Sequence, residues 1–332
     1  LGHCEEVYEK LGVNLTREDV RAESFYNDDL SDVISDLDAK GLLTQSDGAQ
    51  CVFLEGDEVP VIVQKGDGGY LYATTDLAAL RFRAQTLGAK RISYVVDARQ
   101  GGHFKQVFNV AKEAGFVGPD VHLEHIAFGT MMGQDGKPFK TREGGTVKLI
   151  DLLDEAVVKA KGTIKDKASY SDEQIEALAK IIGIGAVKYA DLAINRESNY
   201  IFNWDKMLSF DGNTSLYMQY AYARIQSIFR KYDGTLEGNI IIGDALEHRL
   251  STMLLRFEDV LNRAAIDAAP NQITTYLYDL VTLFMRFYEQ NPILKEGVED
   301  ATKMSRLLLA DLTAKTIKQG LQILGIQTVD KL

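Results

Sequence analysis

Tyr72 and Asp76 stand four residues apart in the segment 68–83, GGYLYATTDLAALRFR. The pattern predicts a strand through Tyr72 that stops at Thr74 and Thr75, both good N-cap residues, so that Asp76 falls in the first turn of a helix. Acidic residues are favoured there because they complement the helix macrodipole, and Tyr72 would then belong to a sheet core. This structural explanation is the commoner one for such a pair. A ligand-binding role is the alternative, and the pattern alone does not decide.

A second group follows the predicted strand 91–97 and includes Gln100, Gly102 and His103 at the start of a predicted helix. Glycines here would let a ligand approach the backbone N–H groups at the positive helix end, which suits an anion or a ribose. The same glycines often form only a turn, and a single histidine is more often a surface or half-buried residue than a catalyst. Taken alone, the group is a weak indication of a binding site.

A third group places Lys137, Lys140 and Arg142 in the glycine-rich segment 133–149, GQDGKPFKTREGGTVKL, between a strand and a helix. Three like charges repel one another unless a polyanion is near. In an otherwise acidic chain the pattern favours a phosphate clamp over a solvated basic loop. The segment lacks the GxxxxGK[ST] spacing, so a Walker-type nucleotide site is not supported.

The elements that must position these residues change along the chain. In the first half, short β-type runs alternate with helical patterns, such as the helical stretch after Asp97 that ends at Gly115. This alternation predicts a mainly parallel α/β sheet, where ligands lie beyond the carboxyl ends of the strands. The predicted strands are 59–65, 70–73, 91–97 and 124–132.

The second half is predicted to be helical throughout. Strand patterns cease at about Thr146, and Ser171 with Gln174 forms a capping-box pattern ahead of apolar residues at helical spacing. The stretch 232–243 is predicted to connect two helices. The expected fold class is therefore α/β followed by all-α.

Composition limits the class of protein. A chain of 332 residues with 45% hydrophobic and 26% charged residues predicts two domains with real cores. No stretch approaches the ~20 apolar residues that span a bilayer, and residues 1–20 lack a secretion leader, so we expect a cytoplasmic protein. Cys4 and Cys51 are expected to be reduced thiols, because neither has a CxxC or histidine partner, and no metal site is expected. The net charge of −11 argues against nonspecific polyanion binding, so contact with nucleic acid must be local.

Nine ordered segments resemble bacterial arginyl-tRNA synthetases, which are class I enzymes. The resemblance implies the second half of a Rossmann-type catalytic domain over residues 1–205 and a helical, DALR-type anticodon-binding domain over 206–332. It implies ATP-dependent joining of L-arginine to tRNA-Arg through arginyl-adenylate, magnesium bound with ATP, and a monomer. The segments are ESFYNDDL, DGAQCVFL, GGYLYATTDLA, DARQGGHFKQVF, DGKPFKTREGGTVKLIDLLDEA, GIGAVKYADL, FNWDKMLSFDGNTSLYMQYAYARI, FYEQNPIL and LTAKTIKQGLQILGI.

The resemblance assigns roles in the arginine and ATP sites. Tyr72 and Asp76 match the pair that holds the arginine guanidinium, and a carboxylate suits this because it accepts two parallel N–H bonds. Gln100 matches a further residue of the amino-acid pocket. Gly102 and His103 would lie by the adenosine.

Lys137 and Lys140 look like the family's degenerate KMSK loop, which steadies the triphosphate as adenylate forms. The family also needs an HIGH motif, and none of the five histidines stands in an HxGH context. We therefore expect the N-terminal domain and the first catalytic half to be missing, and the chain alone to be inactive.

In the helical half, the resemblance implies contact with the anticodon loop. Tyr217, Tyr220 and Arg224 share a helix face, so that the rings would stack on unpaired bases while the guanidinium meets phosphate. Tyr217 and Tyr220 also continue an apolar stripe, so core packing is equally expected for one of them. Tyr288 matches another position that faces the anticodon.

Three other functions compete with this interpretation. A noncatalytic tRNA-binding protein derived from a synthetase would have no need of Tyr72, Asp76 or the lysine loop. A different class I ligase would hold another amino acid, although Asp76 favours a cationic substrate. A purely structural helical scaffold is the third alternative.

Overall fold

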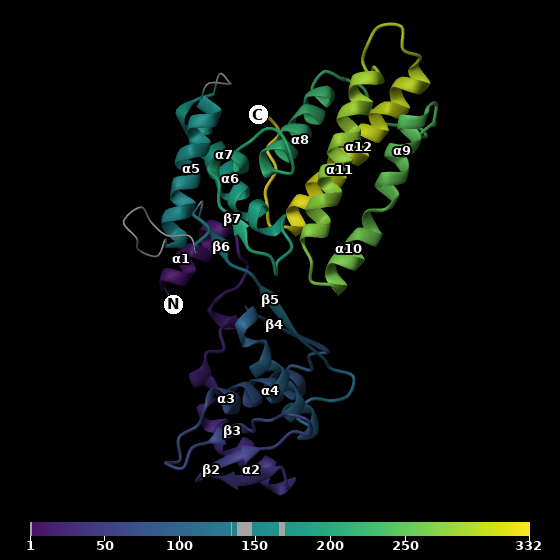
Figure 1. Cartoon of the computed structure of the whole chain (residues 1–332). Helices are drawn as coiled ribbons and strands as arrows, with labels where there is room; N and C mark the ends of the chain where they lie inside the picture. Colours follow the sequence, from purple (N-terminus) through teal and green to yellow (C-terminus); the bar gives the residue numbers. More distant parts are fainter. Residues whose placement is uncertain (1, 134, 138–147, 166–169) are drawn as a thin grey trace. The chain divides into compact units, whose positions relative to one another are not determined.

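The computed structural model describes residues 2–133, 135–137, 148–165 and 170–332 (Figure 1). The chain packs as two compact units, one formed by Leu15–Gly129 and the other by Leu1–Asn14 with Thr130–Leu332. This division by packing differs from the family-based boundary at 205/206, which stays a prediction. Within the described residues, no helix is both long enough and apolar enough to cross a bilayer.

The unit Leu15–Gly129 is built from short helices and two small sheets. Strands β1, β2 and β3 form an antiparallel sheet, and β4 and β5 pair in parallel with Arg91 opposite His122 and Asp97 opposite Phe128. The elements are η1 (Arg17–Asp19), η2 (Glu23–Asp29), α2 (Leu30–Ala39), β1 (Leu43–Ser46), β2 (Ala49–Val52), β3 (Val61–Gln64), α3 (Tyr72–Arg81), η3 (Phe82–Thr86), β4 (Arg91–Asp97), η4 (Ala98–Gln100), α4 (Gly101–Glu113) and β5 (His122–Phe128).

The parallel pair β4 and β5 confirms the predicted strand–helix–strand arrangement, but the prediction of a mainly parallel sheet is wrong for this unit, because β3 lies in the antiparallel sheet with β1 and β2. Helix α4 connects the two strands and buries Phe104, Val107 and Val110 in the core of this unit. Gly115 follows the helix with φ +64°, and its N–H donates to the carbonyl of Lys112, which confirms the predicted helix end. Parallel pairing also brings the carboxyl ends of both strands to the same edge.

The predicted strand at 70–73 is wrong, because helix α3 already begins at Tyr72. Only Tyr70 pairs with the sheet, through an isolated bridge to Gln64. The hydroxyl of Thr74 donates to the carbonyl of Val63, which ties the first helical turn to β3 instead of capping a helix. The alanine-rich run that follows favours helix over the alternating pattern. Asp76 therefore lies beyond the first turn of α3. Interaction with the helix macrodipole is weaker there, so it accounts less well for an acidic residue at this position.

The other unit is mainly helical. Its elements are α1 (Gly2–Leu11), β6 (Met131–Met132), α5 (Leu149–Lys165), α6 (Asp172–Leu192), β7 (Tyr200–Ile201), α7 (Trp204–Met207), α8 (Ser215–Phe229), α9 (Ala245–Leu255), α10 (Phe257–Ile266), α11 (Asn271–Gln290) and α12 (Asp300–Ile323). The capping box of Ser171 and Gln174 at the start of α6 is confirmed, as is the connection 232–243 between α8 and α9. Strand β7 contradicts the prediction that strands cease at about Thr146. Its pairing with β6 covers only two residues, which is too short to show a strand period in the sequence.

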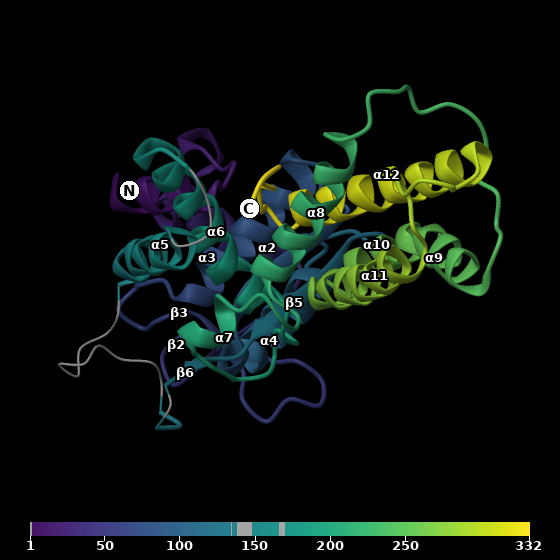
Figure 2. The same ribbon diagram turned by 90° about the horizontal axis from the view of Figure 1, so that it is seen from above.

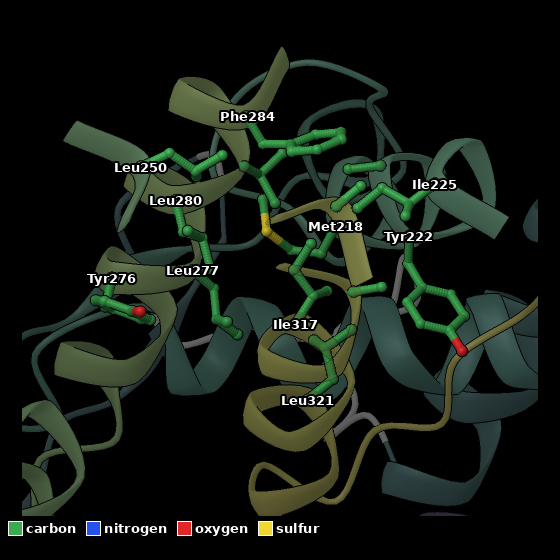
Figure 3. Packing of buried hydrophobic residues seen from close by; sticks show 14 of the residues in the cluster. Met218, Tyr222, Ile225, Leu250, Tyr276, Leu277, Leu280, Phe284, Ile317 and Leu321 are labelled. Atoms are coloured by element: carbon green, nitrogen blue, oxygen red, sulfur yellow. The ribbon is translucent and has the colours of Figure 1, made fainter. Parts of the chain in front are cut away.

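The main core of this unit joins α8, α9, α11 and α12, which lie together in both overall views (Figures 1 and 2). Met218, Leu277 and Phe284 are fully buried there, and Figure 3 shows side chains from all four helices meeting. Helix α6 also belongs to this core through Tyr189, whose hydroxyl donates to the side-chain oxygen of Asn213 at 2.6 Å. The same helix packs along α5.

Helices α5 and α6 approach closely at Gly183. A Cβ added there would lie 2.7 Å from the carbonyl carbon and oxygen of Ala156, which are backbone atoms that cannot move alone. We expect Gly183→Ala to lower the free energy of unfolding by about 1–3 kcal/mol, because overpacking outweighs the helix propensity of alanine. Urea denaturation followed by the fluorescence of Trp204, the single tryptophan, measures this loss.

Gly162 on α5 provides the matched control, since nothing lies within 4 Å of a Cβ added there. Gly162→Ala is expected to leave stability unchanged or raise it by about 0.5–1 kcal/mol. Equal stabilities for the two variants would contradict the close approach at Gly183.

Candidate functional site

A cavity of about 410 Å³ opens in the unit Leu15–Gly129, beyond the carboxyl end of β4. It lies between the start of α3 and the start of α4. One wall therefore contains Tyr72 and Asp76, and the other contains Gln100 and His103. The structure thus brings Tyr72 and Asp76 together with Gln100 and His103, which follow them in the chain only after strand β4. The lining residues are Glu23, Tyr72, Thr75, Asp76, Val96, Gln100, His103 and Phe104.

Helix α3 presents Tyr72 and Asp76 one turn apart on the cavity side. Tyr72 is 73% exposed, so the interpretation that it belongs to a sheet core is wrong. The carboxylate of Asp76 is three-quarters covered, with 25% of its side chain exposed. An exposed aromatic ring beside a partly desolvated carboxylate suits a flat cationic ligand, which can stack and form paired hydrogen bonds at once.

His103 faces Asp76 across the cavity. Its Nε2 lies 2.7 Å from Oδ2 of Asp76, and its ring meets Phe104 edge-on at 5.1 Å. A ligand cation at Asp76 would therefore share the carboxylate with His103. The predicted adenosine contact of His103 and Gly102 stays a prediction. Gly102 has nothing within 4 Å of an added Cβ, so the backbone there is open to a ligand.

Glu23 is a cavity residue that residue patterns did not single out. It lies in the first turn of η2 and lines the same cavity as Asp76, which gives the cavity two carboxylates. A 3-10 segment has neither the helical nor the strand period, so no periodicity marks the residue. The only signal was its place in the segment ESFYNDDL. Two acidic groups in one cavity strengthen the preference for a cationic ligand.

Phe104, which lines the cavity, packs against the largely buried and uncharged side chain of Tyr94. The ring of Phe104 lies 4.7 Å from that of Tyr94, whose hydroxyl accepts a hydrogen bond of 2.6 Å from Nη1 of Arg83. Burial raises the pKa of Tyr94 to about 12, although the charge of Arg83 opposes the shift, so the phenol is uncharged at neutral pH. The negative charge in the cavity therefore comes from its carboxylates.

The rim after β4 is fixed by one ion pair. Arg99 donates from Nε and Nη2 to the two carboxylate oxygens of Asp97, at 2.8 and 3.0 Å. Hydrogen bonds from the side chain and backbone of Arg99 lower the pKa of Asp97 to about 2. This pair holds the turn that leads to Gln100, which is exposed at the N-cap position of α4.

A second candidate surface lies between α8 and α11. Nη1 of Arg224 donates to the hydroxyl of Tyr220 at 2.8 Å, and its guanidinium lies 4.9 Å from the ring centroid of Tyr288. These three predicted residues therefore meet. Tyr217 instead contacts Tyr278, with 6.1 Å between ring centroids, and packs against the core. Tyr217 is therefore partly in the core, and its contact with tRNA, like that of the other three residues, stays a prediction.

Arg224 and Tyr288 also line a cavity of about 440 Å³. Another cavity in this unit, of about 650 Å³, lies between α6, β7 and α7 and contains none of the predicted site residues. Within the parts of the chain that the structure describes, no three His, Cys, Asp or Glu side chains gather as a metal site.

The lysine loop is described only in part. Lys137 is exposed, and its N–H donates to the Asp135 carboxylate at 3.1 Å. Lys140 and Arg142 lie outside the described residues. The phosphate role of both lysines stays a prediction.

Comparison with known families matches nearly the whole chain. Residues 2–204 match the model of the class I tRNA synthetase (R) catalytic domain, and residues 218–332 match the DALR anticodon binding domain. Arginine–tRNA ligases from Laribacter hongkongensis and Cellvibrio japonicus are 54% and 53% identical, each over 100% of this chain. The chain spans 59% of the length of each of these relatives.

Solved structures agree with the family match. The arginyl-tRNA synthetase of Plasmodium falciparum superposes with a TM-score of 0.88 at 31% identity, over 100% of this chain and 56% of that one. The Thermus thermophilus arginyl-tRNA synthetase superposes with a TM-score of 0.82 at 22% identity, over 91% of this chain and 58% of that one. This likeness shows a shared fold. With an α/β catalytic portion, a helical DALR domain and these relatives, the chain belongs to the class I arginyl-tRNA synthetase family.

Proposed function

We propose that this chain provides the arginine pocket, the triphosphate loop and the anticodon-binding domain of an enzyme that joins L-arginine to tRNA-Arg. The observation that carries the proposal is the cavity in which Tyr72, Asp76 and Glu23 meet. A guanidinium is flat, always charged and forked, and two carboxylates beside an exposed ring match each of these properties.

In the proposed reaction, a carboxylate oxygen of arginine attacks the α-phosphorus of ATP and pyrophosphate leaves. The terminal ribose hydroxyl of tRNA-Arg then attacks the carbonyl carbon and AMP leaves. Asp76 and Glu23 hold the guanidinium, and Gln100 lines the same pocket. Lys137 and Lys140 neutralise the triphosphate as charge builds, which is positional and electrostatic catalysis.

Magnesium enters this scheme bound to ATP, and no residue of the chain is proposed as its ligand. The family membership also supports action as a monomer in the cytoplasm. Because the chain spans 59% of its relatives' length, we expect no arginine-dependent ATP–pyrophosphate exchange from these 332 residues alone. Exchange above the blank would refute that expectation.

A noncatalytic tRNA-binding role is the second candidate, favoured by the match of residues 218–332 to the DALR anticodon binding domain. Such a protein would gain nothing from an acidic cavity. Calorimetry of arginine binding to this chain separates the two functions. Binding of arginine supports the enzyme, because a noncatalytic tRNA-binding protein needs no site for a guanidinium.

Binding of tRNA tests the proposed function of the anticodon-binding domain, which this chain contains. We expect tRNA-Arg to bind about 10-fold or more tightly than a non-cognate tRNA of equal length, because shaped recognition adds to the electrostatic term. The preference should persist between about 50 and about 200 mM salt while both affinities fall. Filter binding or fluorescence anisotropy measures it. Equal and weak binding of both tRNAs would contradict recognition by this chain.

A further inference from the structure

The carboxylate of Asp76 is held in one orientation from the opposite wall of its cavity. Its Oδ2 lies 2.7 Å from Nε2 of His103, and a carboxylate only accepts hydrogen bonds, so the imidazole donates from this nitrogen. The last torsion of an aspartate side chain is broad, and a carboxylate without such a donor turns about its own axis. The hydrogen bond from His103 therefore restricts the plane of the carboxylate.

The imidazole that donates this hydrogen bond is itself fixed by aromatic packing. The ring of His103 meets that of Phe104 at 76°, and Phe104 is only 4% exposed. Phe104 in turn contacts the rings of Tyr94 and His125, at centroid distances of 4.7 and 5.5 Å. His103 stands on α4 and Asp76 on α3, and these two helices pack against each other. The packed core of this unit thus sets the plane of the Asp76 carboxylate.

Arginine and lysine differ in what they need from this carboxylate. Glu23, the other acid that lines the cavity, is exposed, and its charge attracts both cations because Coulomb attraction does not depend on their shape. A guanidinium donates two parallel N–H bonds and so requires both carboxylate oxygens in its own plane. An ammonium is a point charge with rotatable donors and requires no such plane. A carboxylate of fixed plane therefore favours arginine over lysine.

We infer that His103 is a positioning residue that sets the preference of this cavity for arginine over lysine, by holding the Asp76 carboxylate in the plane that a guanidinium needs. Each carboxylate oxygen has two lone pairs, so Oδ2 accepts from His103 and from the ligand at once. This role is separate from the adenosine contact that the family resemblance implies for His103, because it needs no ATP. The inference rests on the proposed function, since it requires that the cavity bind arginine.

The test measures the dissociation constants of L-arginine and L-lysine for the full chain by ligand-observed NMR, without ATP. His103→Ala removes the donor, so we expect arginine to bind about 10-fold more weakly, as for the loss of one hydrogen bond to a charged group. Lysine binding should change by less than about 2-fold, because an ammonium needs no fixed plane. The preference for arginine, which is the ratio of the two constants, should therefore fall by about 5-fold or more.

Two further variants separate the plane of Asp76 from other effects of a substitution. His103→Gln keeps an N–H donor at the end of a side chain of similar reach, so it should retain most of the preference for arginine. Lys105→Gln is the matched control, because Lys105 is exposed on the same helix and does not line the cavity. Lysine binding also reports on folding, since a variant with a disrupted cavity loses both amino acids.

Equal losses of arginine and lysine affinity in His103→Ala would overturn the inference, because His103 would then act on the fold or the charge of the cavity. Unaltered binding of both amino acids, or a His103→Gln variant that behaves like His103→Ala, would overturn it as well.

The proposed function has a separate readout, which is the preference of the unaltered chain for arginine over lysine. If this preference is present and the variants do not change it, only the role of His103 is overturned. If the unaltered chain has no such preference, the assignment of the cavity to arginine is overturned too.

Discussion

Replacing Asp76 with asparagine is expected to lower kcat/KM for arginine by about 100- to 1000-fold in the enzyme at its relatives' full length. The asparagine has the same shape and still reaches His103, so the change removes charge and little else. It leaves the guanidinium without one of two carboxylates and offers it an N–H donor where it needs an acceptor. Truncating one partner of a buried charge pair costs about 2–5 kcal/mol, which sets the expected range.

Arginine-dependent ATP–pyrophosphate exchange, at varied arginine and then varied ATP, measures this effect. The KM for ATP should change little, because Asp76 is assigned to the guanidinium alone. Asp38→Asn is the matched control, since Asp38 is exposed on α2 of the same unit and does not line the cavity. An Asp76→Asn enzyme that still selects arginine normally would show that the pocket has been misassigned.

Glu247→Gln should cost about 3–5 kcal/mol of stability, the largest loss we expect from a single change outside the cavity. The side chain of Glu247 is only 2% exposed and lies at the start of α9. One oxygen accepts from Nε of Arg306 at 2.8 Å, and the other accepts from the N–H of Gly243 at 2.6 Å. An amide in its place must turn an NH₂ group toward one of these donors. A guanidinium that is 16% exposed would then lose its counter-charge.

Urea denaturation followed by Trp204 fluorescence measures this loss, because Trp204 lies in the same compact unit as α9. Glu258→Gln is the control. Glu258 also stands in the first turn of a helix, α10, but is exposed. The two variants would have equal stabilities if Glu247 served only to complement a helix macrodipole, which contributes about 0.3–1 kcal/mol.

Local patterns predicted the elements that short-range chemistry decides. The strand at β4, the end of α4 before Gly115 and the capping box of Ser171 each depend on residues close in sequence, and the structure has all three. The start of α3 was misplaced because a tertiary hydrogen bond from Thr74 to β3 replaced the local cap. The family resemblance named half of the residues that line the cavity, whereas periodicity alone left the role of Asp76 undecided.

The missed features all depend on contacts between distant segments. Glu23 reaches the cavity from an irregular turn, and His103 meets Asp76 only because α3 and α4 pack together. Glu247 looks in the sequence like any acid at a helix start, and its burial against Arg306 follows from the packing of α9 and α12.

Helix α6 also bears on how this protein can have been assembled in evolution. It lies inside the match to the catalytic domain, yet Tyr189 is buried in the core of the anticodon-binding helices. The helices matched to the anticodon domain therefore share their core with a helix of the catalytic match. A gene fusion that carried only the residues after α6 to another protein would leave behind Tyr189, which is buried in this core. Transfer of a stable anticodon-binding domain to another protein should then require a longer segment that includes α6.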